Sequence, residues 1–161
     1  MTHSNPILYG PFAETTPSGQ SGWIDETRQT IAERVHTMLN KLDGQNTFTY
    51  SIWRGDDPTS IIATRHRVDH TFIQATGSVA AMKIEVQLTD KDGLTHFYGV
   101  GNKDVMSQKE VMLPIGAGHS VRVFENELFT AEQAADAFKE FYSNNTLSIA
   151  YSLRELDLTS E

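Results

Sequence analysis

The sequence predicts an α+β domain in which an antiparallel β-sheet is covered on one face by two helices. Two segments repeat apolar residues with helical spacing, and the chain between them mostly alternates apolar with polar residues. A short strand pattern follows the second helix. The order of helix, several strands, helix and strand favours helices gathered on one face of an antiparallel sheet. A chain of 161 residues suits one domain that buries its own core.

The chain begins with residues 1–22, which are rich in Gly, Pro, Ser and Thr and which we predict to be an arm or loop. A single α+β domain is predicted over residues 23–158. Its first helix is predicted over residues 24–42 and ends at Asp43-Gly44. Apolar residues form one stripe along this helix, with charged residues off the stripe: Ile24, Ile31, Val35, Met38, Leu39 and Leu42.

Strands are predicted wherever the apolar period changes to two. The clearest is the segment 80–89, which alternates apolar and polar side chains and is followed by the hairpin signal Asp92-Gly93. The predicted strands cover residues 48–53, 61–63, 71–73, 80–89, 94–100, 110–115, 120–124 and 147–153.

The second helix has a readable start and end. Thr130 and Gln133 have the spacing of a capping box, in which each side chain satisfies an amide of the first turn. Ala134, Phe138 and Phe141 recur with helical spacing and are predicted to pack on the sheet. Asn144-Asn145 supplies a residue type that tolerates the left-handed conformation at a helix end.

The net charge of −8 disfavours direct binding to nucleic acid, whose phosphates an acidic protein repels. Residues 104–161 carry 10 acidic against 4 basic residues, whereas residues 1–103 carry 11 against 9. This charge would suit a basic protein partner, and solubility alone is the alternative explanation.

Several classes of function are disfavoured by composition. The chain has no cysteine, so disulfides, thiol catalysis and cysteine-based zinc sites are excluded. We find no signal-peptide pattern and no apolar run near the ~20 residues that span a membrane, so we predict a cytoplasmic protein without membrane contact. Nucleotide-binding glycine motifs are absent, and we expect no cofactor.

Two histidines are the candidate metal ligands. His66 and His70 are four residues apart, so a helix or a strand would place both on one face. Asp69, His96 or His119 would be the third ligand, but no spacing selects one of them. The segment lacks the glutamate of the zinc-protease motif, and a solvated polar loop is the favoured interpretation, so we expect no metal.

Paired carboxylates occur twice. Asp56 and Asp57 precede a proline, which is typical of a turn. Glu125 and Glu127 would project from the same side of a strand, a spacing that suits a general acid and base. No serine nucleophile elbow accompanies them, and we expect no catalysis.

Four segments carry a resemblance to a known family. They are Gly93-Leu-Thr-His-Phe-Tyr-Gly-Val-Gly101, Val111-Met-Leu-Pro-Ile115, the Ala-rich helix Ala134-Ala-Asp-Ala-Phe-Lys-Glu-Phe141, and the closing segment 147–156. In this order they resemble the immunity proteins of bacterial polymorphic toxin systems, specifically the first-numbered Imm family that is often encoded beside nucleic-acid deaminase toxins. Thr146-Leu147 and Tyr151 stand where that family usually has a proline and a tryptophan.

The resemblance implies a protein that binds a cognate toxin domain, blocks its substrate cleft and protects the producing cell. Acidic residues would dock on a toxin cleft that is basic because it accepts nucleic acid, and aromatic residues would anchor the contact. The candidate partner-binding residues are Asp56, Asp57, Glu125, Glu127, Trp53 and Tyr98, with Tyr151 as a further aromatic anchor.

Two alternatives remain open. One is a small α+β enzyme or ligand-binding module, with a pocket between sheet and helices that uses His66, His70 or Glu125. The other is a structural or regulatory accessory protein of a phage or a secretion system. The sequence does not specify the oligomeric state.

Overall fold

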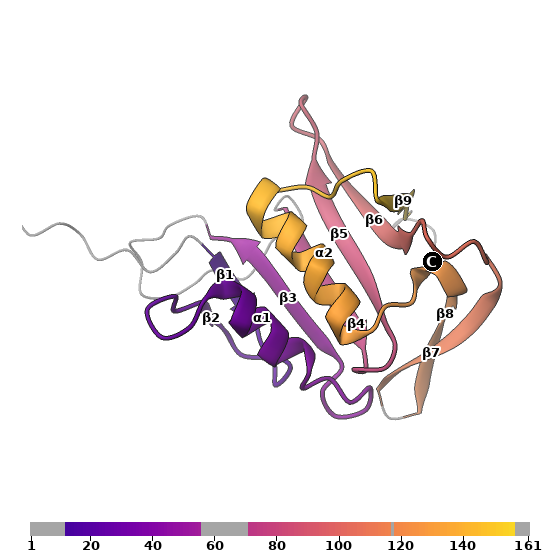
Figure 1. Cartoon of the computed structure of the whole chain (residues 1–161), viewed down its shortest axis with the longest axis horizontal. Coiled ribbons are helices and arrows are strands. Elements are labelled where there is room, and N and C mark those ends of the chain that lie inside the picture. The colour runs from indigo at the N-terminus through magenta and orange to yellow at the C-terminus, as the bar shows by residue number, and fades with distance from the viewer. Residues whose placement is uncertain (1–11, 56–70, 117, 157–161) are drawn as a thin grey trace, which may run out of the picture.

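The computed structural model describes residues 12–55, 71–116 and 118–156. Within these ranges it contains a seven-stranded sheet with the order β2-β1-β3-β4-β5-β6-β9 and a separate hairpin, β7–β8 (Figure 1). All neighbouring strands are antiparallel, so the predicted α+β class is confirmed. The strands are β1 (Phe12–Thr15), β2 (Ser21–Trp23), β3 (Thr49–Arg54), β4 (Phe72–Gly77), β5 (Met82–Thr89), β6 (Thr95–Asn102), β7 (Glu110–Gly116), β8 (His119–Phe124) and β9 (Tyr151–Glu155).

The helices α1 (Ile31–Leu39) and α2 (Ala131–Asn144) lie side by side across one face of the sheet (Figure 1). The caps predicted for α2 are confirmed. Thr130 Oγ1 accepts the amide of Gln133 at 3.2 Å, and Gln133 Oε1 accepts the amide of Thr130 at 2.9 Å. Asn145 ends the helix in the left-handed conformation, with φ of 59°.

Helix α1 is shorter than the predicted 24–42. Ile24 continues the sheet, because its amide donates to Phe12 O at 2.9 Å. The Asp25 carboxylate accepts both the amide and the hydroxyl of Thr27, which forms a local turn that competes with helix. The helix therefore begins after Thr30, whose hydroxyl accepts the amide of Glu33 at 3.1 Å.

The predicted N-terminal arm over residues 1–22 is wrong from residue 12 onward. Strand β1 pairs with β3, placing Ala13 opposite Trp53 and Glu14 opposite Ile52. This pairing joins segments almost 40 residues apart, and the Gly- and Ser-rich composition of the region does not reveal it. Residues 1–11 lie outside the described part, as does the predicted strand 61–63.

The closing strand β9 begins at Tyr151 rather than at Leu147. Leu147 instead packs into the hydrophobic core, and the amide of Ser148 donates to Glu140 Oε1 at 3.1 Å. The chain thus crosses from the end of α2 to the sheet before it pairs with β6. In that pairing Val100 lies opposite Leu153 and Tyr98 opposite Glu155.

The main core fills the space between the helices and the sheet. Phe138 of α2 stacks on Tyr50 of β3 with ring centroids 5.8 Å apart. A smaller cluster of Ala13, Trp53 and Phe72 lies apart from this core, with Trp23 and Phe97 packed against it. Because Tyr50 and Ile52 of β3 belong to the main core, the alternating Trp53 places this second cluster on the opposite face of the sheet.

Candidate partner-binding surface

The structure separates the residues that the sequence grouped as a partner-binding site. Asp56 and Asp57 lie outside the described residues, and so do His66 and His70 of the alternative site. Among the described residues, no group of three or more His, Asp or Glu side chains is placed to hold a metal ion. The space between sheet and helices, where the alternative pocket was expected, is occupied by core side chains.

Trp53 is fully buried, with 0% of its surface exposed. It lies on the face of β3 that is turned away from the helices, where it packs with Ala13 and Phe72. This corrects the prediction of an exposed aromatic anchor. The alternating pattern correctly indicated a strand, but it could not indicate that both faces of that strand would be covered.

Glu125 and Glu127 do not project from one side of a strand, because the segment Glu125–Glu127 forms a 3₁₀ turn, η1. Glu127 is only 5% exposed and accepts two hydrogen bonds from Arg154, from Nε and Nη2, each at 2.9 Å. It also accepts the amide of Phe124 at 3.1 Å. Its oxygens are therefore used within the fold, and Glu125 is the exposed acid of the two.

Tyr98 is half-buried and packs against the main core. Its ring lies 6.2 Å from that of His96, centroid to centroid. Part of the ring remains accessible, so the prediction of Tyr98 as a contact residue stays open. Tyr98 does not lie among the residues that line the clefts described below.

His96 links the β5–β6 hairpin to β9. Its Nδ1 lies 3.0 Å from Glu155 Oε1, and its Nε2 lies 3.0 Å from Asp90 Oδ2. Glu155 and then Asp90 raise the pKa of His96 above its ordinary value, because both carboxylates favour the imidazolium. The hydrogen bond from His96 and the amide of Leu94 lower the pKa of Asp90.

We expect the His96→Asn variant to lose stability relative to the parent protein at about pH 6 and to differ less at about pH 8.5. The pKa of His96 is higher in the folded protein than its unfolded value near 6.5. The charged imidazolium therefore stabilises the fold fully below that unfolded pKa, and this stability is lost as the pH rises through the folded-state pKa. Urea unfolding at both pH values measures the difference. His119→Asn, at an exposed position, is the control. If the difference in unfolding free energy between the parent and His96→Asn grew as the pH rose, the stabilising role of charged His96 would be contradicted.

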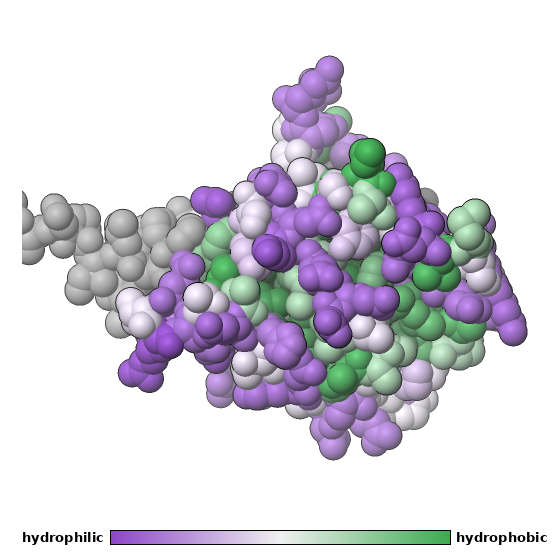
Figure 2. Space-filling view, viewed as in Figure 1, coloured by the Kyte–Doolittle hydropathy of each residue, from purple (hydrophilic) through white to green (hydrophobic). Residues whose placement is uncertain are grey.

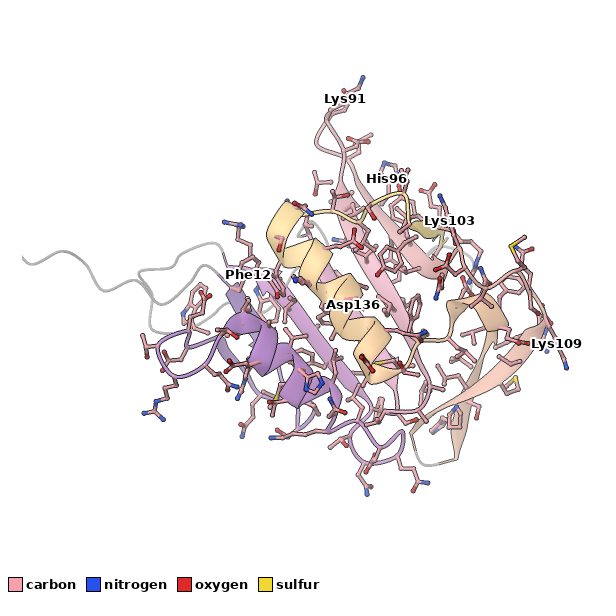
Figure 3. All side chains as sticks on the ribbon, in the orientation of Figure 1. Phe12, Lys91, His96, Lys103, Lys109 and Asp136 are labelled. Atoms are coloured by element: carbon pink, nitrogen blue, oxygen red, sulfur yellow. The ribbon has the colours of Figure 1, made fainter. Side chains whose placement is uncertain are left out.

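An acidic cleft of about 230 Å³ lies between α2, the end of β6 and the start of β9. No cationic side chain is among its described lining residues, which are Asn102, Asp104, Phe129, Gln133, Asp136, Ala150 and Tyr151. Asp104 sits in a turn in which its amide donates to Asn102 Oδ1 at 2.9 Å. Asp136 lies on the solvent side of α2 (Figure 3). Among the described residues, neither carboxylate forms an ion pair.

The pKa of the Tyr151 hydroxyl is raised by burial and by nearby carboxylates. Its half-buried ring lies 6.3 Å from that of Phe129, and partial burial raises the pKa of its hydroxyl to about 12. The carboxylates of Glu140 and Asp136 contribute to the same rise, because they oppose a phenolate. The cleft therefore combines two carboxylates with the rings of Phe129 and Tyr151, which suits a cationic side chain of a partner.

A second cleft of about 220 Å³ lies between the β7–β8 hairpin and the sheet, and cations line it. Each cation has a carboxylate partner: Lys83 with Glu85 at 3.1 Å, Arg122 with Glu110 at 3.6 Å, and Arg154 with Glu127 at 2.9 Å. These pairs neutralise the charge that an anionic ligand would need. Of these pairs, Arg154–Glu127 joins β9 to η1, whereas Lys83–Glu85 lies within β5 and Arg122–Glu110 lies within the β7–β8 hairpin.

Sequence reasoning missed Asp104 and Asp136. Asp136 was visible as a polar position on the capped helix, and Asp104 as an acid just after a strand. Only the fold brings them to one cleft with Tyr151, which the sequence had suggested as an anchor.

Comparisons with protein-family models, with curated proteins and with solved structures find no match to this chain. Among the described helices, none is both long enough and apolar enough to cross a membrane.

Proposed function

We propose that the protein is a cytoplasmic immunity protein that binds a nucleic-acid-targeting bacterial toxin domain and occludes its active site with an acidic surface. The observation that carries the proposal is the acidic cleft, in which Asp104 and Asp136 have no cationic partner among the described residues and flank Tyr151. The net charge of −8 and the resemblance of the element order to immunity proteins support it.

The physical basis is charge complementarity. A toxin that acts on DNA or RNA presents basic residues around its cleft to hold phosphates. Carboxylates that are not neutralised within their own protein can take the place of those phosphates and steer the encounter. Tyr151 adds an amphipathic ring at the edge of the cleft, the type of residue that often dominates an interface.

We expect the double reversal Asp104→Lys/Asp136→Lys to slow association with the cognate toxin domain, which the proposal expects a neighbouring gene to encode, by about tenfold or more. The remaining affinity should depend less on salt, because the complementary charge is removed. Stopped-flow association at several salt concentrations measures both effects. Rescue of growth on co-expression with the toxin domain tests the function itself.

The matched control is Glu26→Lys/Asp92→Lys, which changes the net charge equally at two exposed positions that do not line the cleft. Equal slowing by both pairs would indicate general electrostatics and no specific surface. A toxin domain that neither co-purifies with the chain nor is neutralised by it would overturn the proposed function.

A further inference from the structure

Strand β9 ends the seven-stranded sheet, and no described strand pairs with its outer edge. The direction of its backbone groups follows from the pairing with β6. The amide of Leu156 donates to Phe97 O at 2.8 Å, and bonding residues alternate along an antiparallel pair. Ser152 and Arg154 therefore bond to β6, whereas the amides and carbonyls of Leu153 and Glu155 point away from the sheet.

Apolar side chains accompany these outward backbone groups. Leu153 is 38% exposed, and Ile149, just before the strand, is 89% exposed. Apolar residues interrupt the hydrophilic surface on the side of β9 and the β7–β8 hairpin (Figure 2). An edge that combines free backbone groups with exposed apolar side chains is suited to strand addition.

Clefts lie on both sides of this edge. The acidic cleft borders the start of β9 through Ala150 and Tyr151, on the face that carries the helices. A groove of about 350 Å³ follows the strand on the other side, between β9 and the segment that holds Gln108, Phe124 and Asn126. Side chains of a strand added to β9 would alternate between the two faces of the sheet, one set on the side of the acidic cleft and the other on the side of the groove.

We propose that the outer edge of β9 accepts an extended basic segment of the partner protein as an eighth strand. The inference rests on the proposed function and names how that partner is held. On the helix-bearing face, the added strand would pass the end of the cleft that holds Asp104 and Asp136, whose negative charge attracts basic residues in that strand. Side chains on the opposite face of the added strand would lie on the side of the groove beside Phe124.

Charge decides between this occupant and a second copy of the chain. Two copies that each carry a net charge of −8 repel one another, whereas a basic segment is attracted to the same edge. The other terminal strand, β2, is a weaker template because it spans three residues, compared with five in β9. The β9 edge therefore offers the longer ladder and the complementary charge.

Hydrogen exchange of the complex with the toxin domain encoded by the adjacent gene tests the inference. The amides of Leu153 and Glu155 should exchange at least tenfold more slowly in the complex than in the free protein, because the added strand occupies them. A complex that forms while these amides keep their free exchange rates overturns the inference and leaves the proposed function standing. Failure to form any complex overturns both.

The variant Leu153→Pro removes an outward amide, which an edge strand tolerates, and should weaken toxin binding by roughly tenfold or more. Ser21→Pro is the matched control, because the Ser21 amide points outward from β2 by the same alternation. It should leave toxin binding unchanged. Equal weakening by both variants would overturn the inference. Sedimentation of the parent protein gives a second test. A dimer that Leu153→Pro disrupts would overturn the inference in favour of a second copy of the chain at this edge.

Discussion

A protein with Phe138 replaced by alanine is expected to lose about 4 kcal/mol of unfolding free energy. Phe138 is fully buried at the centre of the main core and stacks on Tyr50 with an interplanar angle of 12°. Removing the ring forfeits its burial and leaves a cavity, because the neighbouring buried residues Ala134, Ala137 and Phe141 keep α2 packed in place and limit its collapse onto the sheet. Urea unfolding followed by far-ultraviolet circular dichroism measures the loss.

The graded control is Phe138→Leu, which keeps most of the apolar volume and should cost less than half as much. Native proteins have a total stability of roughly 5–15 kcal/mol, so Phe138→Ala should lose a large share of this stability and still fold. A loss below about 1.5 kcal/mol would contradict the packing of α2 on β3 described above.

Replacing Arg34 by methionine should lower the unfolding free energy by about 3 kcal/mol. Glu14 of β1 is 3% exposed and accepts hydrogen bonds from Arg34 Nε at 3.0 Å and from the Tyr50 hydroxyl at 2.9 Å. Without the Arg34 guanidinium, the buried Glu14 carboxylate keeps only the Tyr50 hydroxyl as a hydrogen-bond donor among the described residues. Its desolvation is then uncompensated.

Two variants test this explanation. Arg28→Met removes an exposed arginine that lies 3.7 Å from Asp25, and it should cost less than about 0.5 kcal/mol. The triple replacement Glu14→Leu/Arg34→Met/Tyr50→Phe removes the whole polar network and should recover much of the loss. A triple variant less stable than Arg34→Met would show that the network contributes more than the avoidance of a buried charge.

The sequence predicted best those elements that depend on near neighbours. The cap at Thr130, the end at Asn145 and the buried stripe of α2 involve residues within one or two helical turns, and each is confirmed. The hairpin at Asp92-Gly93 is also confirmed, because it too depends on a few adjacent residues. Helix α1 was predicted too long because Ile24, apolar and in phase with the stripe, instead follows β2 and hydrogen-bonds to Phe12 of β1.

The candidate surface was predicted less well, because the exposure of its residues depends on contacts with segments far away in the sequence. Glu127 was proposed as an exposed acid, but Arg154, 27 residues away, binds it within the fold. Trp53 was proposed as an anchor, yet β1 brings Ala13 against it. Asp56 and Asp57 lie outside the described residues and stay predictions.

The local pattern of this chain is therefore enough to specify its helix caps, its hairpin turn and its α+β class. Whether a charged or aromatic side chain stays at the surface depends on contacts that close large loops, such as those of Glu14 with Arg34 and Tyr50. A carboxylate looks the same in the sequence whether it meets water or a distant arginine. Only the tertiary structure decides this, because the desolvation and pairing energies arise when remote segments come together.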